Sequence, residues 1–176
     1  MDFARVFDDV ATFLEAHGHP VAVIGGLALL GHGLTRTTFD LDVLTGAEAR
    51  QGLLSLLSGF GYETLHASAG FSNHAHPDPD RGRVDVVYVD AATEKQIIEG
   101  ATARLTLGKR VALVPRAEHL IALQVQAMKN DPRRAPGDLA DVHFLLGLPG
   151  VDRAEARGYF TRAGMEERFD ELIRSL

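Results

Sequence analysis

Apolar residues follow two different periods along the chain, and the change between them falls near residue 115. Before that point, short apolar runs typical of strands alternate with segments whose apolar residues have helical spacing. After Pro115, only segments with helical spacing remain. The pattern predicts strands over 21–24, 39–44, 62–66, 70–76 and 83–89, and helices over 2–17, 27–30, 47–57, 91–99, 116–129, 137–147, 152–163 and 165–174.

These elements predict an α+β fold, with a mixed β-sheet and flanking helices over residues 1–114 and a helical bundle over 115–176. Turn-forming residues join the strands 70–76 and 83–89, and Gly108 marks the turn of a second hairpin within 101–114. Hairpins require antiparallel pairing, so a doubly wound parallel sheet is excluded. We expect the two parts to pack as a single compact unit.

Composition narrows the function classes. The 176 residues include 45% hydrophobic residues and no cysteine, which excludes disulfides, thiolate–zinc sites and a cysteine nucleophile. No apolar run reaches the roughly 20 residues that span a bilayer, and the N-terminus lacks a signal pattern, so we expect a cytoplasmic protein with no membrane partner. The net charge of -6 argues against a broadly basic nucleic-acid surface.

Two acids interrupt the apolar run of the strand predicted over residues 39–44. Side chains alternate along a strand, so Asp40 and Asp42 should share one face. Phe39, Leu41 and Val43 should then take the opposite, core face. Carboxylates so close together repel each other unless a cation lies between them.

A third acid has the same kind of environment. Asp85 lies between Val84 and Val86, so it should face the same way as Asp40 and Asp42 if the two strands adjoin. Three such carboxylates suit Mg²⁺, which prefers oxygen ligands. The alternative is a set of acids on a solvated sheet face.

A glycine pair precedes the acids. Neither the dinucleotide-binding fingerprint nor the P-loop is present, since Gly26 and Gly31 have P-loop spacing but His32-Gly33 follow in place of Lys-Ser. Gly25-Gly26 can still let the backbone approach a phosphate at the start of a helix. A tight turn without a ligand is the alternative.

The order of these motifs resembles the nucleotidyltransferase superfamily of polymerase beta type. The resemblance rests on Gly25-Gly26, Asp40-Leu41-Asp42-Val43 and the later Asp85. The segment over residues 120–146 is similar to the C-terminal helical region of abortive-infection type nucleotidyltransferases, a group that includes toxins of toxin–antitoxin pairs. The resemblance implies a nucleotidyltransferase-like mixed sheet followed by a helical bundle.

The resemblance also implies a reaction. Asp40, Asp42 and Asp85 would be catalytic and would bind two Mg²⁺ ions, with Mn²⁺ as the alternative, while Gly25 and Gly26 would hold a nucleoside triphosphate such as ATP. A hydroxyl on tRNA, a protein or a small molecule would attack the α-phosphorus, and Asp85 would help to deprotonate it. The toxin subtype would bring an antitoxin partner, and the sequence makes no prediction of oligomeric state.

Four further residues are candidates for nucleotide binding. Arg36 precedes the first acid and can pair with a phosphate, although a surface role suits it equally. Asp138 also suits an early-helix position, and Asp141 an ion pair with Arg133 or Arg134. All four candidates have charged side chains; they are Arg36, Lys129, Asp138 and Asp141.

Two positions depart from the family pattern. Gln124 and Gly137 stand where relatives usually carry lysine, and Lys129 lies about 140° from Gln124 around a helix, so it cannot take its place. A weakened relative that binds nucleotide or a protein partner is therefore the alternative function. A hydrolase using the same acids is a third possibility.

Histidines offer one other candidate site. His74 and His76 share a strand face, as in some zinc sites, but no third ligand is evident beyond acids in the turn. We expect a solvated hairpin end there. His32, near the end of the short helix, is expected to be a capping or surface residue.

Overall fold

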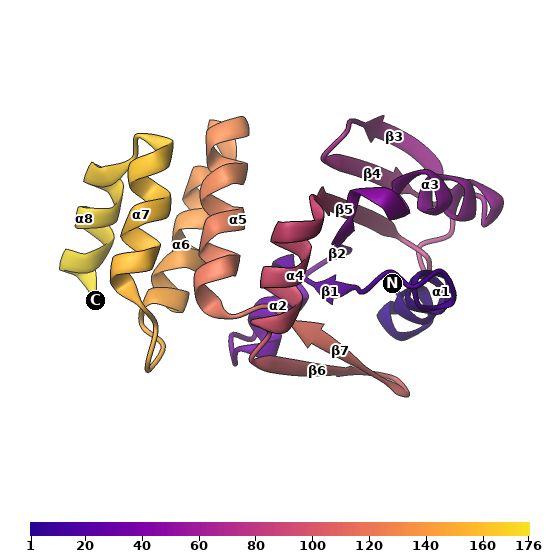
Figure 1. Cartoon of the computed structure of the whole chain (residues 1–176), viewed down its shortest axis with the longest axis horizontal. Helices are drawn as coiled ribbons and strands as arrows, with labels where there is room; N and C mark the ends of the chain where they lie inside the picture. Colours follow the sequence, from indigo (N-terminus) through magenta and orange to yellow (C-terminus); the bar gives the residue numbers. More distant parts are fainter. The chain divides into compact units, whose positions relative to one another are not determined.

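The computed structural model describes residues 1–176, which form two compact units, Met1–Pro115 and Arg116–Leu176. Figure 1 shows a sheet with helices in the first unit and helices lying side by side in the second. Each unit is described by itself below.

The first unit contains a seven-stranded mixed sheet in the order β3-β4-β5-β2-β1-β7-β6. The β1/β7 and β2/β5 pairs are parallel and the others antiparallel, which confirms the predicted mixed sheet. Both predicted hairpins are present, as β4/β5 and β6/β7. The strands are β1 Ala22–Val23, β2 Asp40–Gly46, β3 Glu63–Ala67, β4 Phe71–Ala75, β5 Arg83–Val89, β6 Ala103–Leu107 and β7 Arg110–Val114.

Four α-helices belong to this unit. The apolar face of α1 enters the same buried cluster as Leu41 and Val43 of β2. Asp90 caps α4 by accepting hydrogen bonds from the N–H groups of Ala92 and Thr93, at 3.0 and 2.9 Å. The helices are α1 Phe3–Ala16, α2 Gly25–Gly31, α3 Arg50–Gly59 after a 3₁₀ turn over Ala47–Ala49, and α4 Ala91–Glu99.

Two local predictions need correction. The short helix expected to start at Leu27 begins at Gly25, so the glycine pair forms its first turn. Phe39 was expected in the core but is 78% exposed. Its place before the first register pair of β2 and β5, Asp40 with Arg83, explains the error, because alternation begins only where the strand is paired.

The second unit contains four α-helices, as predicted. Its buried side chains include Ile121, Met128, Leu145 and Phe160, and Gly164, with φ of 72°, ends the third helix. No helix of the chain is both long and apolar enough to cross a bilayer. The helices are α5 Ala117–Asn130, α6 Ala135–Leu146 after a 3₁₀ turn over Pro132–Arg134, α7 Arg153–Ala163 and α8 Glu166–Ser175.

Candidate active site

Three carboxylates converge on one face of the sheet where β2 and β5 run side by side. Asp42 stands directly opposite Asp85 in the parallel register, and Asp40 lies two residues earlier on β2. Leu41 and Val43 are fully buried on the opposite face. Each acid is half-buried and offers one oxygen, and the three oxygens lie within 4.8 Å of one another. The strand alternation therefore gathers the acids and buries the apolar residues between them.

Neutral donors orient two of these acids. The Thr38 hydroxyl donates to Asp40 Oδ1 at 3.0 Å, and the Asn73 amide donates to Asp85 Oδ1 at 2.6 Å. Asn73 stands opposite Asp85 in the β4/β5 register and is nearly buried. A neutral donor fixes a carboxylate without cancelling its charge. Neither donor is marked by a pattern in the sequence, and only the hairpin register identifies Asn73.

The glycine pair contacts the strand that carries the acids. Gly25 has φ of 59°, and a Cβ there would lie 2.1 Å from Asp42 Oδ2. A Cβ on Gly26 would lie 2.7 Å from the Thr38 side chain. The turn therefore has no room for side chains, because the acid and its neighbour occupy that space. The backbone of Gly25 lies directly beside the Asp42 carboxylate.

One cation lies beside the same turn. Arg36 is exposed, in the loop before β2, and its Nη2 atom would be 3.4 Å from a Cβ on Gly26. The structure thus brings together six predicted residues from two strands, one loop and one turn. They are Gly25, Gly26, Arg36, Asp40, Asp42 and Asp85.

The other three candidates belong to the second unit. Lys129 is exposed in the last turn of α5. Asp138, buried in the first turn of α6, accepts from Arg134 Nε at 3.2 Å. Asp141, also buried, accepts a hydrogen bond from the Gln124 amide at 3.3 Å. Gln124 is the residue that stands where lysine was expected from the resemblance.

The histidine prediction was wrong at His74, which is fully buried. Its ring bonds Ser72 Oγ at 2.8 Å and Thr64 Oγ1 at 3.1 Å, and burial lowers the pKa of its imidazole. The reason is the sheet order, since β4 lies between β3 and β5. His32, in contrast, is confirmed as the capping residue of α2, with its Nε2 2.8 Å from the Pro115 carbonyl.

No protein-family model and no curated protein sequence matches this chain. Several solved structures do resemble it. The antibiotic-resistance factor ANT(2'')-Ia, in complex with adenylyl-2''-tobramycin, superposes with a TM-score of 0.58 at 13% identity over 98% of this chain and 97% of that one. A nucleotidyltransferase-like antigen from Paracoccidioides brasiliensis gives 0.55 at 17% identity, over 96% and 92%.

The fold is that of the nucleotidyltransferases. The lincosamide antibiotic adenylyltransferase LnuA, with lincomycin bound, adds a third example, with a TM-score of 0.54 at 13% identity over 81% of this chain and 96% of that one. The predicted nucleotidyltransferase-like architecture is thereby confirmed. At these identities the likeness concerns the fold, so the activity has to be argued from the acids and the glycine turn.

Proposed function

We propose that this protein is a Mg²⁺-dependent nucleotidyltransferase that moves a nucleoside monophosphate from a nucleoside triphosphate to a hydroxyl group. One observation carries the proposal. Asp40, Asp42 and Asp85 place three carboxylate oxygens within 4.8 Å of one another, next to a glycine turn that has no room for side chains. The nucleotidyltransferase fold supports it.

The three acids fit a magnesium site. In octahedral Mg²⁺ coordination the ligands lie about 2.1 Å from the ion, which separates neighbouring oxygens by about 3 Å and opposite oxygens by about 4 Å. The three carboxylate oxygens, all within 4.8 Å of one another, are already close to these separations. All donors are oxygens, which suits Mg²⁺ or Mn²⁺. A bound Mg²⁺ supplies charge neutralisation on the phosphate oxygens.

The chain's own residues would divide the remaining work. The Gly25-Gly26 backbone accommodates the triphosphate, and Arg36 pairs with one of its oxygens. The acceptor oxygen bonds to the α-phosphorus as the bond to the leaving pyrophosphate breaks. Asp85 takes the proton of the acceptor hydroxyl, and the Asn73 hydrogen bond holds that carboxylate in position.

The donor and acceptor can be narrowed from the structures that share the fold. ANT(2'')-Ia was solved with adenylyl-2''-tobramycin bound, and LnuA is a lincosamide antibiotic adenylyltransferase. We therefore place ATP first among donors and a small-molecule hydroxyl first among acceptors. A tRNA or protein acceptor, and a toxin role with an antitoxin partner, follow from the sequence resemblance. Lys129, Asp138 and Asp141 are proposed as nucleotide contacts from the second unit.

Label transfer tests the proposal. The protein is incubated with α-labelled nucleoside triphosphates, Mg²⁺ and a panel of aminoglycosides, lincosamides, tRNA and protein extract. Transfer should require Mg²⁺ and should fall about a thousandfold or more in Asp40→Ala plus Asp42→Ala. Asp170→Ala, which removes a surface carboxylate of α8, is the matched control. Undiminished transfer by the double variant would contradict the proposed site.

A second candidate function has its own observation. Gln124 replaces a family lysine and is bonded to Asp141, and Gly137 offers no side chain at all. A weakened relative that binds nucleotide or a protein without transfer would show heat of nucleotide binding in calorimetry but no labelled product. A hydrolase would instead release phosphate or pyrophosphate without any acceptor.

A further inference from the structure

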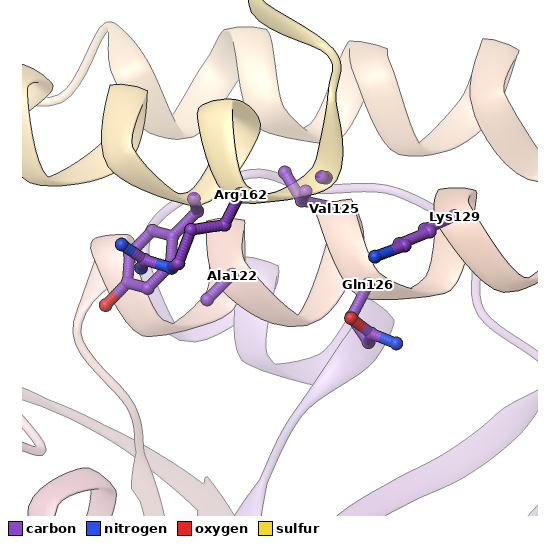
Figure 2. Close-up of a pocket in the computed structure, with 7 residues that line it drawn as sticks. Ala122, Val125, Gln126, Lys129 and Arg162 are labelled. Atoms are coloured by element: carbon purple, nitrogen blue, oxygen red, sulfur yellow. The ribbon is translucent and has the colours of Figure 1, made fainter.

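A small pocket lies between α5 and α7 of the second unit. Its volume is about 100 Å³. A pocket of this size has room for a small anion. The pocket is lined by Ala122, Val125, Gln126 and Lys129 of α5 and by Tyr159 and Arg162 of α7 (Figure 2).

Two cations, and no acid, are among the residues that line this pocket. Figure 2 shows Lys129 of α5 on one side of the pocket and Arg162 of α7 on the other side. Neither takes part in any ion pair of the chain, whereas Arg116 and Arg157 in the same unit are both paired with carboxylates. An anion bound in the hollow would be attracted by both positive charges.

The guanidinium of Arg162 is held in place by an aromatic ring. Its Cζ atom lies 4.8 Å from the centre of the Tyr159 ring. The Tyr159 hydroxyl donates to Glu155 Oε1 at 2.7 Å, which fixes the ring in turn. Burial raises the pKa of Tyr159 to about 12, so the ring stays neutral at physiological pH. The cation is therefore oriented before any ligand arrives.

The pocket is separate from the position where the family lysine would stand. At about 100° per residue, Val125, Gln126 and Lys129 lie about 100°, 200° and 140° from Gln124 around α5. The Gln124 side chain itself is bonded to Asp141 of α6, on another flank of the helix. A ligand in this pocket would therefore lie on a different flank of α5 from the Gln124 side chain.

Helix ends alone do not account for the arrangement. Lys129 and Arg162 both stand in the last turn of their helix, where a positive charge is favoured by the helix dipole. This effect explains each cation separately. It does not explain why both line one hollow with no carboxylate between them.

We propose that this pocket binds a small phosphate-type oxyanion, either one phosphate or a pyrophosphate, with Lys129 and Arg162 as its two charged partners. Both cations can donate charge-assisted hydrogen bonds to phosphate oxygens. Ala122 and Val125 form the apolar floor between them. Pyrophosphate is also the product that the proposed transfer would release.

Binding of inorganic phosphate and of pyrophosphate, each followed by NMR titration, tests this inference. The titrations use EDTA, no nucleotide and constant ionic strength. Phosphate should shift the amide signals of Ala122 and Val125, and Lys129→Gln or Arg162→Gln should weaken binding about ten- to a hundredfold. Arg168→Gln, which removes an exposed positive charge from α8, should leave the affinity unchanged.

The two ligands distinguish the source of the anion. Tighter phosphate binding would support a single-phosphate site, and tighter pyrophosphate binding a site that spans two phosphoryl groups. Absence of binding, or equal binding by the wild type and all three variants, would overturn the inference. Since no metal or nucleotide is present, the result does not depend on whether the protein transfers nucleotides.

Discussion

Charged residues are arranged in opposite ways in the acid site of the sheet and in the Arg116 cluster of the helical unit. On the sheet, Asp40, Asp42 and Asp85 bring like charges within 4.8 Å of one another. In the helical unit, Arg116 lies between two carboxylates, 2.9 Å from Glu155 and 3.3 Å from Glu118. Opposite charges neutralise each other without a ligand, whereas converging like charges are stabilised by a bound counter-ion. The first arrangement is typical of a site and the second of a scaffold.

The Arg116 cluster joins separate helices of its unit. Arg116 precedes α5 and forms two hydrogen bonds to Glu155 of α7. Glu118 is buried and also accepts from the backbone N–H of Asp152 at 2.7 Å. The cluster thus connects α5 to the start of α7. Its loss should lower the free energy of unfolding and leave the catalytic activity of the folded protein unchanged.

The largest effect on stability is expected from Gly25→Ala. The new Cβ would lie 2.1 Å from Asp42 Oδ2 at a residue with φ of 59°. Strain and overlap together should lower the free energy of unfolding by about 2–5 kcal/mol. Mg²⁺ should no longer stabilise the variant, because the carboxylate must move. Urea denaturation with and without Mg²⁺ measures both effects.

Gly18→Ala is the matched control for that variant. Gly18 has φ of 74°, and a Cβ there would meet nothing within 4 Å. Only backbone strain remains, about 1 kcal/mol, and the Mg²⁺ effect should be retained. Equal losses in the two variants would show that contact with Asp42 does not matter.

Acid should weaken the scaffold arrangement. The hydrogen bonds from Arg116 hold the pKa of Glu155 below its ordinary 4.5, so its contribution is present above that pH and is lost as the pH falls further. Burial lowers the pKa of His119 below 6.5, so folding favours the neutral ring and stability also declines below pH 6.5. Unfolding of the second unit should therefore become easier from pH 6.5 downward.

The same cluster predicts how a variant changes that profile. Glu155→Gln should lower the free energy of unfolding by about 1–3 kcal/mol at pH 7 and should flatten the decline below pH 4.5. Thermal unfolding across this pH range measures both. Asp170→Asn, at an exposed ion pair, is the control and should change stability by less than about 1 kcal/mol. An unchanged acid profile in Glu155→Gln would contradict the assignment.

Strand alternation alone located the acids. Because the side-chain period of a strand is two, Leu41 and Val43 place Asp40 and Asp42 on the other face without any knowledge of the fold. The same argument located Asp85 on β5. Placing Asp85 beside the other two acids also required β2 and β5 to be neighbours in the sheet, and the structure shows that they are.

Features that depend on the order and register of strands could not be predicted. Asn73 reaches Asp85 only because of the β4/β5 register. His74 is buried because β4 is an inner strand, and Phe39 is exposed because pairing starts one residue later. Each depends on contacts between residues distant in sequence, which local pattern does not contain.

The smallest effect is expected from placing lysine at residues 124 and 137, where the nucleotidyltransferases that the sequence resembles usually carry it. A Cβ at Gly137 would meet nothing within 4 Å, so Gln124→Lys plus Gly137→Lys should fold normally. If the second unit contacts a triphosphate, nucleotide affinity should rise up to about tenfold, equivalent to ~1.4 kcal/mol. Titration calorimetry measures the nucleotide affinity. Gly59→Lys, which adds a positive charge at the end of α3, is the control. An equal gain in that control would indicate a general charge effect.

Thermal stability of wild type and Asp42→Asn, with and without Mg²⁺, tests the central claim most directly. Without metal, the variant should be the more stable, because one of three converging charges is removed. At a Mg²⁺ concentration about ten times the dissociation constant, the wild type should gain about 1.4 kcal/mol and the variant clearly less. Equal gains in the two proteins would show that Asp42 is not a metal ligand and would contradict the proposed site.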